Sequence, residues 1–273
     1  MPPDHGFLSI GNILHNIDLR TAFDRLRAVS VEADPAAEPT AVETCERCHD
    51  IGLLRRDVAA SHPQFGQPIE CPCGLVAVRR SLRIWEASQL PARYHQFTLA
   101  SYATISGRHA LAEKLGDWRA GERWLLLTGD VGVGKTGIAA SLLVEAMRTG
   151  SPGLYISMPM FLSRIRATYR DGGDDTDEMA VLGSVGSVPW LVLDDVGVAV
   201  LTEWGREKLY TIVNERAADC RRTILTSNLR VGDGSLQEHV GERTWDRIRG
   251  LADVVNLTGQ SLRGLPGSYQ ARS

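Results

Sequence analysis

The amino-acid sequence predicts an α/β fold in which a five-stranded parallel β-sheet carries a phosphate-binding loop. Three observations indicate this fold: a glycine-rich loop at 129–136 between an apolar strand and a helix, a second apolar strand that ends at Asp194–Asp195, and a third that ends at Asn228. Two further strands are expected at 153–157 and 253–257. Strands that alternate with helical segments in this way are typical of a parallel sheet covered by helices.

The loop contains every residue of the pattern G-x-x-x-x-G-K-[ST]. Trp124–Thr128 is predicted to enter it as a buried strand, and Lys135–Thr149 to leave it as a helix with one apolar face. Glycines let successive backbone N–H groups turn toward phosphate oxygens at a helix N-terminus, where the helix dipole favours anions. The strand and the helix argue against a glycine-rich turn without function. The residues expected to bind a nucleoside triphosphate are Gly129, Asp130, Val131, Gly132, Val133, Gly134, Lys135 and Thr136.

Two residues of this loop have particular roles in the motif. Lys135 is expected to contact the β- and γ-phosphates, and the hydroxyl of Thr136 to be a ligand for Mg²⁺. The run Trp190–Asp195 is an apolar strand ending in two acids, which is typical of a Walker B element. The carboxyl end of such a buried parallel strand lies beside the ligand in an open α/β sheet. We therefore predict that Asp194 holds Mg²⁺ through its water shell and that Asp195 orients and polarises the attacking water.

Asn228 ends the strand predicted at 223–228. Its position in the series of strands puts it between the phosphate loop and the acidic strand. The side-chain amide is therefore expected to hold the attacking water near the γ-phosphate. A simple turn residue is the alternative interpretation.

The helix predicted at 159–169 follows the second strand, and three arginines lie outside its apolar face. Arg164, Arg166 and Arg170 are therefore candidates for salt-sensitive contacts to the backbone of a nucleic acid. A solvated helix face is the alternative. Other helices are expected at 75–88, 101–116, 177–182 and, capped by Thr202, up to residue 218.

The amino-terminal part contains two close cysteine pairs on either side of a stretch that reads as irregular and turn-rich. Two such pairs suit a tetrahedral structural Zn²⁺ site, and metal binding would supply folding energy to a segment with little apolar surface. His49 or His62 lies close enough in sequence to replace one thiolate, while a redox dithiol or buried thiols are other interpretations. Cys220 stands apart and is expected to be a small buried residue. The predicted zinc ligands are Cys45, Cys48, Cys71 and Cys73.

The composition is that of a globular protein without a generally basic surface. The chain has 273 residues, of which 43% are hydrophobic, and a formal net charge of −3, so any nucleic-acid contact must come from local arginine clusters. No export signal or membrane span is recognisable, which favours a cytoplasmic protein with reduced thiols.

A short amphipathic helix is expected at 18–26 and a linker at 33–41. We predict a partner-binding domain over 1–90, with a Cys₄ module at about 45–73, and an ATPase domain over 91–273.

The order of these motifs, with arginines after the last one, resembles that of AAA+ ATPases. A guanine-reading Asn-Lys-x-Asp segment, which translation-type GTPases contain, is absent. Within that class the chain resembles the bacterial replicative helicase loaders of the DnaC and DnaI type and the related IstB transposition helper ATPases. The resemblance covers about residues 91–263. It rests on Leu193-Asp194-Asp195-Val196-Gly197, Asn214-Glu215-Arg216, Thr226-Ser227-Asn228-Leu229 and Gly241-Glu242-Arg243-Thr244-Trp245-Asp246-Arg247.

The resemblance implies that ATP is the nucleotide and that subunits associate through their ATP sites. Arg247 matches the family's arginine finger, with Arg243 and Arg249 as neighbouring candidates, and Arg263 matches a second-sensor arginine. No separate helical lid is expected after Arg263. The cysteine pairs favour a loader that places a replicative ring helicase on single-stranded DNA. The alternatives are an IstB-like or phage-encoded helper ATPase with another DNA-processing partner, and a zinc-module adaptor that uses ATP as a binding switch.

Overall fold

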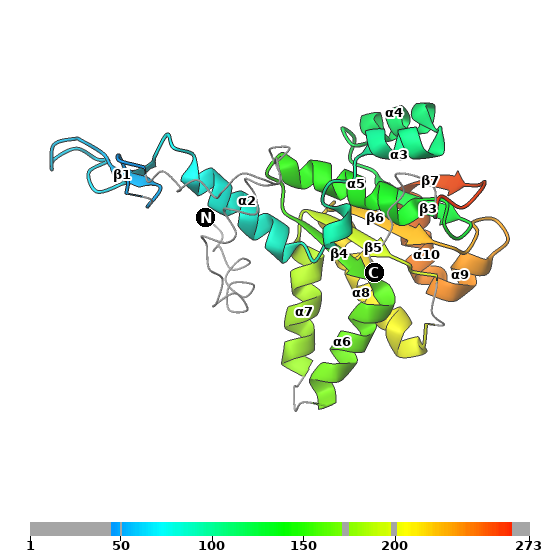
Figure 1. Cartoon of the computed structure of the whole chain (residues 1–273). Coiled ribbons are helices and arrows are strands. Elements are labelled where there is room, and N and C mark those ends of the chain that lie inside the picture. Colours follow the sequence, from blue (N-terminus) through cyan, green and yellow to red (C-terminus); the bar gives the residue numbers. More distant parts are fainter. Residues whose placement is uncertain (1–44, 50, 171–174, 198–200, 264–273) are drawn as a thin grey trace. The chain divides into compact units, whose positions relative to one another are not determined.

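The structure is a computed structural model that describes residues 45–49, 51–170, 175–197 and 201–263 (Figure 1). The chain divides into two compact units, one up to Arg83 and one from Ile84 onward. The helix expected at 18–26 and the linker expected at 33–41 lie outside the described residues.

The first unit is built on a short hairpin beside the cysteine pairs. Strand β1 (Leu53–Arg55) pairs with β2 (Pro68–Glu70) in antiparallel register, with Leu54 opposite Ile69. Helix α2 (Leu75–Ala87) follows, as predicted. The expectation of an irregular stretch between the cysteine pairs was wrong at these two strands, because three-residue strands are too short to produce a recognisable alternation of apolar and polar residues.

The second unit contains the predicted five-stranded parallel sheet, with the strand order β4-β5-β6-β3-β7. This order puts β6 between the strand that enters the phosphate loop and the strand that ends in two acids. Neighbouring strands pair in parallel throughout, for example Leu126 with Leu225 and Val192 with Ile224. The strands are β3 (Trp124–Gly129), β4 (Gly153–Ser157), β5 (Trp190–Asp194), β6 (Arg222–Ser227) and β7 (Ala252–Leu257).

Helices cover both faces of this sheet (Figure 1). The long helices were predicted, although the one expected at 177–182 is longer. The two helices between β6 and β7 were not predicted: the first has only six residues, and the second follows Gly241 and carries many charges. The helical stretches expected through 101–116 are two helices separated at Gly107, which has a left-handed backbone. The helices are η2 (Ala92–Tyr94), α3 (Leu99–Ser106), α4 (His109–Trp118), α5 (Lys135–Arg148), α6 (Met158–Arg170), α7 (Asp175–Ser187), α8 (Glu203–Ala218), α9 (Ser235–Val240) and α10 (Glu242–Leu251).

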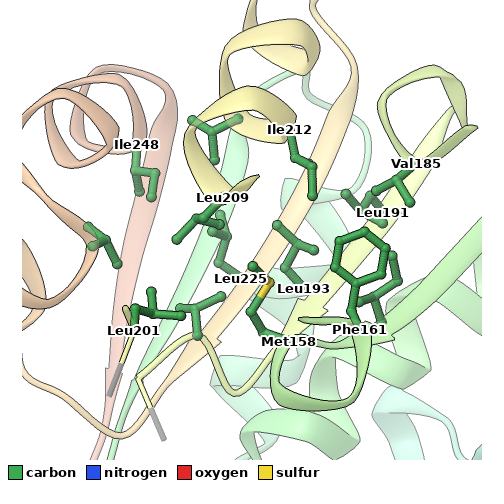
Figure 2. Close-up of a cluster of buried hydrophobic side chains, with 14 of the residues drawn as sticks. Met158, Phe161, Val185, Leu191, Leu193, Leu201, Leu209, Ile212, Leu225 and Ile248 are labelled. Carbon is green, nitrogen blue, oxygen red and sulfur yellow. The ribbon is translucent and has the colours of Figure 1, made fainter. Parts of the chain in front are cut away.

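Side chains alternate along the central strands between two apolar clusters. On one face, residues such as Leu193 and Leu225 pack against α6, α7, α8 and α10, as Figure 2 shows for Phe161, Leu209 and Ile248. On the other face, the strands pack against α5, α3 and α4. Helix α5 was expected to have one apolar face, but it is buried on nearly every side because α3 and η2 cover its outer surface.

One arginine is fully enclosed in this second unit. The side chain of Arg216, on α8, is 0% exposed, and its Nη1 donates to the carbonyls of Val185, Gly186 and Val188 at 3.0, 3.1 and 2.8 Å. Its Nε donates to the Thr223 hydroxyl at 2.9 Å. Burial lowers the pKa of Arg216 to about 9, so it stays charged at neutral pH. The guanidinium thus joins α8 to β6, to the last turn of α7 and to the segment that connects α7 with β5.

Two further observations concern residues outside the core. The expectation that Cys220 is buried was wrong, because its side chain is exposed. Cys220 lies in the turn after α8 and has a left-handed backbone, with a φ of 52°. In the part of the chain that the structure describes, no helix is both long enough and apolar enough to cross a membrane.

Candidate nucleotide-binding site

The phosphate loop joins the end of β3 to the start of α5, as the sequence predicts. Gly129 has a φ of 131°, and a Cβ atom at this position would lie 1.9 Å from the carbonyl oxygen of Leu257 on β7. Gly134 is the N-cap of α5 with a φ of 101°, so a side chain there would be strained. Glycine is therefore required at both ends of the loop. Both positions have a positive φ, and at Gly129 the neighbouring carbonyl also leaves no space for a Cβ atom.

Lys135 is the first residue of α5, and its side chain turns back into the loop. It is 6% exposed, and its Nζ donates to the carbonyls of Gly129 at 2.8 Å and Asp130 at 2.7 Å. Burial lowers the pKa of Lys135, and the carboxylates of Asp195 and Asp194 act in the opposite direction. The ammonium group is therefore held within the loop, beside the residues predicted to bind phosphate.

Asp194 ends β5 beside the loop, and its carboxylate accepts hydrogen bonds from three hydroxyls. Thr136 Oγ1 donates to Oδ1 at 2.9 Å, Thr226 Oγ1 donates to Oδ1 at 2.6 Å, and Tyr155 Oη donates to Oδ2 at 2.6 Å. The structure therefore brings together Thr136 and Asp194, which the sequence predicts as the two protein groups at Mg²⁺. A carboxylate beside a hydroxyl is an oxygen donor set that suits this cation.

Asp195 follows directly and has a left-handed backbone, with a φ of 60°. Its N–H donates to Thr226 Oγ1 at 2.9 Å, and this contact fixes the turn that ends β5. Burial raises the pKa of the Asp195 carboxyl, and the Asp194 carboxylate adds to the shift, whereas Lys135 and Arg263 oppose it. A partly buried carboxyl next to a second carboxylate is an arrangement found at catalytic sites.

This shift predicts a change in stability when the charge is removed. In protein without nucleotide or added Mg²⁺, the raised pKa means that ionised Asp195 lowers stability above that pKa, and that the penalty disappears as the pH falls below its unfolded value of about 3.9. Asp195→Asn is therefore expected to raise the melting temperature at neutral pH, and the gain should shrink on acidification.

Thermal unfolding at a series of pH values measures this effect. Asp117→Asn, which changes an exposed carboxyl on α4, is the matched control and should give no such pH-dependent gain. A gain for Asp195→Asn that is the same at every pH would contradict the assignment.

The remaining predicted residues of the nucleotide site lie around the same end of the sheet. Asn228 follows β6, which lies between β3 and β5, and its side chain is half-buried. Arg263 is exposed and close enough to influence the pKa values of Asp195 and Lys135. The preceding residue, Leu262, donates its N–H to the carbonyl of Gly132 at 2.9 Å, so the segment after β7 is joined to the phosphate loop.

The arginines considered for the finger lie on α10, away from the buried face formed by Thr244, Trp245 and Ile248. Arg249 donates to Asp246 at 3.3 Å. Among the described residues, neither Arg243 nor Arg247 forms an ion pair, and both are exposed. Their side chains are therefore available to a second chain.

The arginines considered for DNA lie on α6. Arg164 is exposed and donates to Oε1 of Gln89 at 2.8 Å. Arg166 is exposed, donates to the Thr202 hydroxyl at 3.3 Å and stacks over the Trp204 ring at 4.9 Å. Arg170 is the last residue of the helix, and its side chain lies outside the description. Both described guanidinium groups are thus accessible, although each already has a neutral partner.

Sequence reasoning missed two residues of the site. Tyr155 is on β4, and Thr226 is on β6, and both touch the acidic end of β5. Thr226 lies in the strand predicted at 223–228 and in a segment quoted for its resemblance, but no role at the site was predicted for it. The available signal was a polar side chain near the carboxyl end of each neighbouring strand, but which strands are neighbours became known only from the sheet order.

The first unit contains a separate candidate metal site. The four Sγ atoms of Cys45, Cys48, Cys71 and Cys73 lie within 4.8 Å of one another, and two of the pairs are 3.8 and 3.7 Å apart. Tetrahedral zinc with Zn–S bonds of about 2.3 Å requires sulfurs about 3.8 Å apart, so the thiols fit this ion. Backbone hydrogen bonds from Cys48 and Arg47 lower the pKa of Cys45 to about 7, whereas burial and the neighbouring thiols raise the pKa of Cys71 to about 12, so the fit to a metal rests on the sulfur distances. Neither His49 nor His62 belongs to the cluster.

The strand order, the loop and the acidic strand define a P-loop nucleotide-binding protein. Within this class, the chain belongs to the family of IstB-like ATP binding proteins, whose model matches residues 77–268. The match begins after Cys73, so the cysteine cluster lies outside it.

Individual relatives include both insertion-sequence proteins and helicase loaders. The chain is 39% identical over 120 residues to the insertion sequence IS1162 putative ATP-binding protein of Pseudomonas fluorescens, covering 44% of this chain and 50% of that protein. It is 28% identical over 124 residues to the replicative helicase loader DnaC of Escherichia coli, covering 45% of this chain and 49% of that protein. The chain thus spans about half the length of the curated relatives it matches.

Solved structures share the fold. The crystal structure of DnaI matches with a TM-score of 0.52 and 23% identity, covering 63% of this chain and 96% of that chain. The replication initiator DnaA bound to AMPPCP and single-stranded DNA matches with a TM-score of 0.51 and 22% identity, covering 62% of this chain and 52% of that chain. At this level of identity the likeness concerns the fold alone.

Proposed function

We propose that this chain hydrolyses ATP at sites shared between neighbouring subunits and uses that cycle to act on a DNA-processing partner. The observation that carries the proposal is the arrangement of Lys135, Thr136, Asp194 and Asp195 at one end of the sheet. A loop lysine, a hydroxyl beside a carboxylate, and a second, partly buried carboxyl are the groups that ATP hydrolysis needs at one place.

Each group has a defined part in this reaction. Mg²⁺ would be held by Thr136 and, through water, by Asp194, and it would neutralise phosphate charge. Lys135 binds the β- and γ-phosphates. Asp195 orients the attacking water and polarises it, and the amide of Asn228 holds that water from the neighbouring strand. Arg263 contributes positive charge near the γ-phosphate from the segment that is joined to the loop.

The site is completed by a neighbouring subunit. We assign Arg247 as the group that enters the ATP site of the next chain, where its guanidinium offsets charge on the γ-phosphate. The exposed, unpaired state of this side chain among the described residues supports the assignment. Hydrolysis then depends on assembly, because an isolated chain lacks the arginine in trans.

The partner we propose first is a replicative ring helicase, which the protein would place on single-stranded DNA. The similarity to the loaders named DnaC and DnaI supports this partner, and so does the cysteine unit that precedes the matched segment. Arg164 and Arg166 would contact the DNA backbone electrostatically, and such binding weakens with salt. Loading requires the protein to hold the helicase and the single-stranded DNA at the same time.

A second partner class is supported by the family match and by the 39% identical insertion-sequence relative. In that case the protein would assist a transposition complex instead of a helicase. A third possibility, an adaptor that binds ATP without turnover, predicts no steady-state hydrolysis with any partner.

Steady-state hydrolysis assays with each partner test the adaptor, and co-purification separates the two partner classes. The full chain is mixed with the replicative helicase, or with a transposase, from the same source, with ATP, with ADP and without nucleotide. ATP-dependent retention of the helicase, abolished by Lys135→Ala, is the result we expect. Retention of the transposase alone would favour the second function, and retention that Lys135→Ala leaves unchanged would contradict a motor.

We propose that the four cysteines hold one structural zinc ion. The protein purified under reducing conditions is expected to contain about one zinc per chain, and Cys48→Ser should release it and unfold the hairpin unit, because the metal supplies the folding energy there. Metal analysis and limited proteolysis measure both effects. Cys220→Ser, which changes an exposed thiol outside the cluster, is the control and should retain the ion. Wild-type protein without zinc would contradict the assignment.

A further inference from the structure

We propose that Tyr155 is a positioning residue for ATP hydrolysis, because its hydroxyl fixes the Asp194 carboxylate in the orientation in which Asp194 and Thr136 face the same Mg²⁺. The inference rests on the proposed function. Tyr155 belongs to none of the motifs that indicate the nucleotide site, and it acts through Asp194 without contacting the nucleotide.

The register of the sheet explains how Tyr155 reaches Asp194. Tyr155 on β4 pairs with Val192 on β5, and Val192 is two residues before Asp194. Side chains two residues apart lie on the same face of a strand, so Tyr155, Val192 and Asp194 share one face. The tyrosine side chain is long enough to extend along this face, and its Oη donates to Asp194 Oδ2 at 2.6 Å. A shorter side chain at this register position could not make the contact.

The contact completes a set of hydroxyl donors around one carboxylate. A carboxylate offers about four lone-pair sites, and Thr136, Tyr155 and Thr226 occupy three of them. The two strong contacts at 2.6 Å come from opposite neighbours of β5, namely β4 and β6, and each holds a different oxygen. The carboxylate is therefore fixed against rotation.

The tyrosine hydroxyl also keeps its proton in this place. Tyr155 is 7% exposed, and its ring packs in the apolar cluster that includes Val192, Ile138 and Leu142. Burial raises the pKa of Tyr155, and the adjacent Asp194 carboxylate raises it further, so the hydroxyl is protonated at neutral pH and donates to Asp194. A buried hydroxyl needs a hydrogen-bond partner, and Asp194 supplies it.

Tyr155→Phe tests the inference because it removes the hydroxyl and leaves the ring. The Mg²⁺ concentration at half-maximal binding of a slowly hydrolysed fluorescent ATP analogue is measured for wild type and variant, together with binding in the absence of Mg²⁺. We expect the Mg²⁺ midpoint to rise about 10- to 100-fold, as is typical when a group that orients a metal ligand is lost, with metal-free binding unchanged. The turnover number in ATP hydrolysis should fall by a similar factor, with little change in KM for ATP at saturating Mg²⁺.

Companion variants keep the test interpretable if Tyr155→Phe folds poorly. Thr226→Val removes the second strong hydroxyl contact to Asp194 and should raise the same midpoint, whereas Thr226→Ser keeps the hydroxyl and should restore it. Tyr210→Phe changes a half-buried tyrosine on α8 and serves as the matched control.

The outcomes separate this inference from the proposed function. A wild-type protein that neither binds nor hydrolyses ATP in a Mg²⁺-dependent way would overturn the proposed function. If wild type does so and Tyr155→Phe has the same Mg²⁺ midpoint, only the role of Tyr155 is wrong. A variant that weakens binding equally with and without Mg²⁺ would also overturn it, because that result indicates a structural role alone.

Discussion

Arg247→Ala is expected to lower ATP hydrolysis by about 10³- to 10⁵-fold while ATP binding is retained. The guanidinium is exposed on α10 and forms no ion pair among the described residues, and its proposed role is to offset charge on the γ-phosphate of a neighbouring chain. The loop of each chain keeps Lys135, Thr136 and Asp194, so binding should survive the change. Steady-state hydrolysis and equilibrium binding of a fluorescent ATP analogue measure the two effects separately.

The neighbouring arginines are the controls for this prediction. Arg249→Ala removes a side chain that is paired with Asp246 on the same helix, and it should alter hydrolysis by less than about tenfold. Arg243 lies one helical turn before Arg247, so Arg243→Ala distinguishes the two candidates. If Arg243→Ala abolishes hydrolysis and Arg247→Ala does not, the finger has been assigned to the wrong residue.

Arg216→Met is expected to destabilise the second unit by about 3–5 kcal/mol. The guanidinium is fully buried, and it donates to the carbonyls of Val185, Gly186 and Val188, which a methionine leaves without a donor. Each buried polar group left unsatisfied costs about 1–3 kcal/mol, against a total stability of about 5–15 kcal/mol for a typical domain. The free energy of unfolding from urea titration measures the loss.

Arg123→Met provides the comparison. Arg123 is half-exposed and donates to Asp253 at 2.6 Å, and surface pairs of this kind contribute about 0–1 kcal/mol. If both variants lose the same small amount of stability, Arg216 is not the structural connection between α8 and the segment before β5 that its contacts indicate.

Much of the second unit could be predicted from sequence because its signals are local. The phosphate loop is a contiguous motif, β5 is an unbroken apolar run ending in acids, and α8 begins with a side-chain cap at Thr202, which accepts from the Gly205 N–H at 3.2 Å. Elements whose sequence pattern depends on only a few residues were not predicted. The β1–β2 hairpin has three residues on each strand, and α10 lacks a long apolar pattern.

The parts of the site that sequence reasoning missed depend on contacts between distant segments. Tyr155 meets Asp194 only because β4 pairs with β5 in a register that aligns Tyr155 with Val192. Arg216 was quoted as part of a resemblance, but its burial follows from the way α7, α8 and β6 meet. Neither relation is encoded in spacing along the chain. Cys220 was expected to be buried because of its residue type, but the turn in which it lies exposes its side chain.

Mixing two inactive variants tests most directly whether the ATP site is shared between subunits. Arg247→Ala chains keep an intact loop and acids, and Asp195→Asn chains keep the arginine, so each variant alone should be nearly inactive. A random mixture forms some interfaces with both intact halves, and we predict that it recovers about a quarter of the wild-type hydrolysis rate. A mixture no more active than its two components would contradict a site completed in trans.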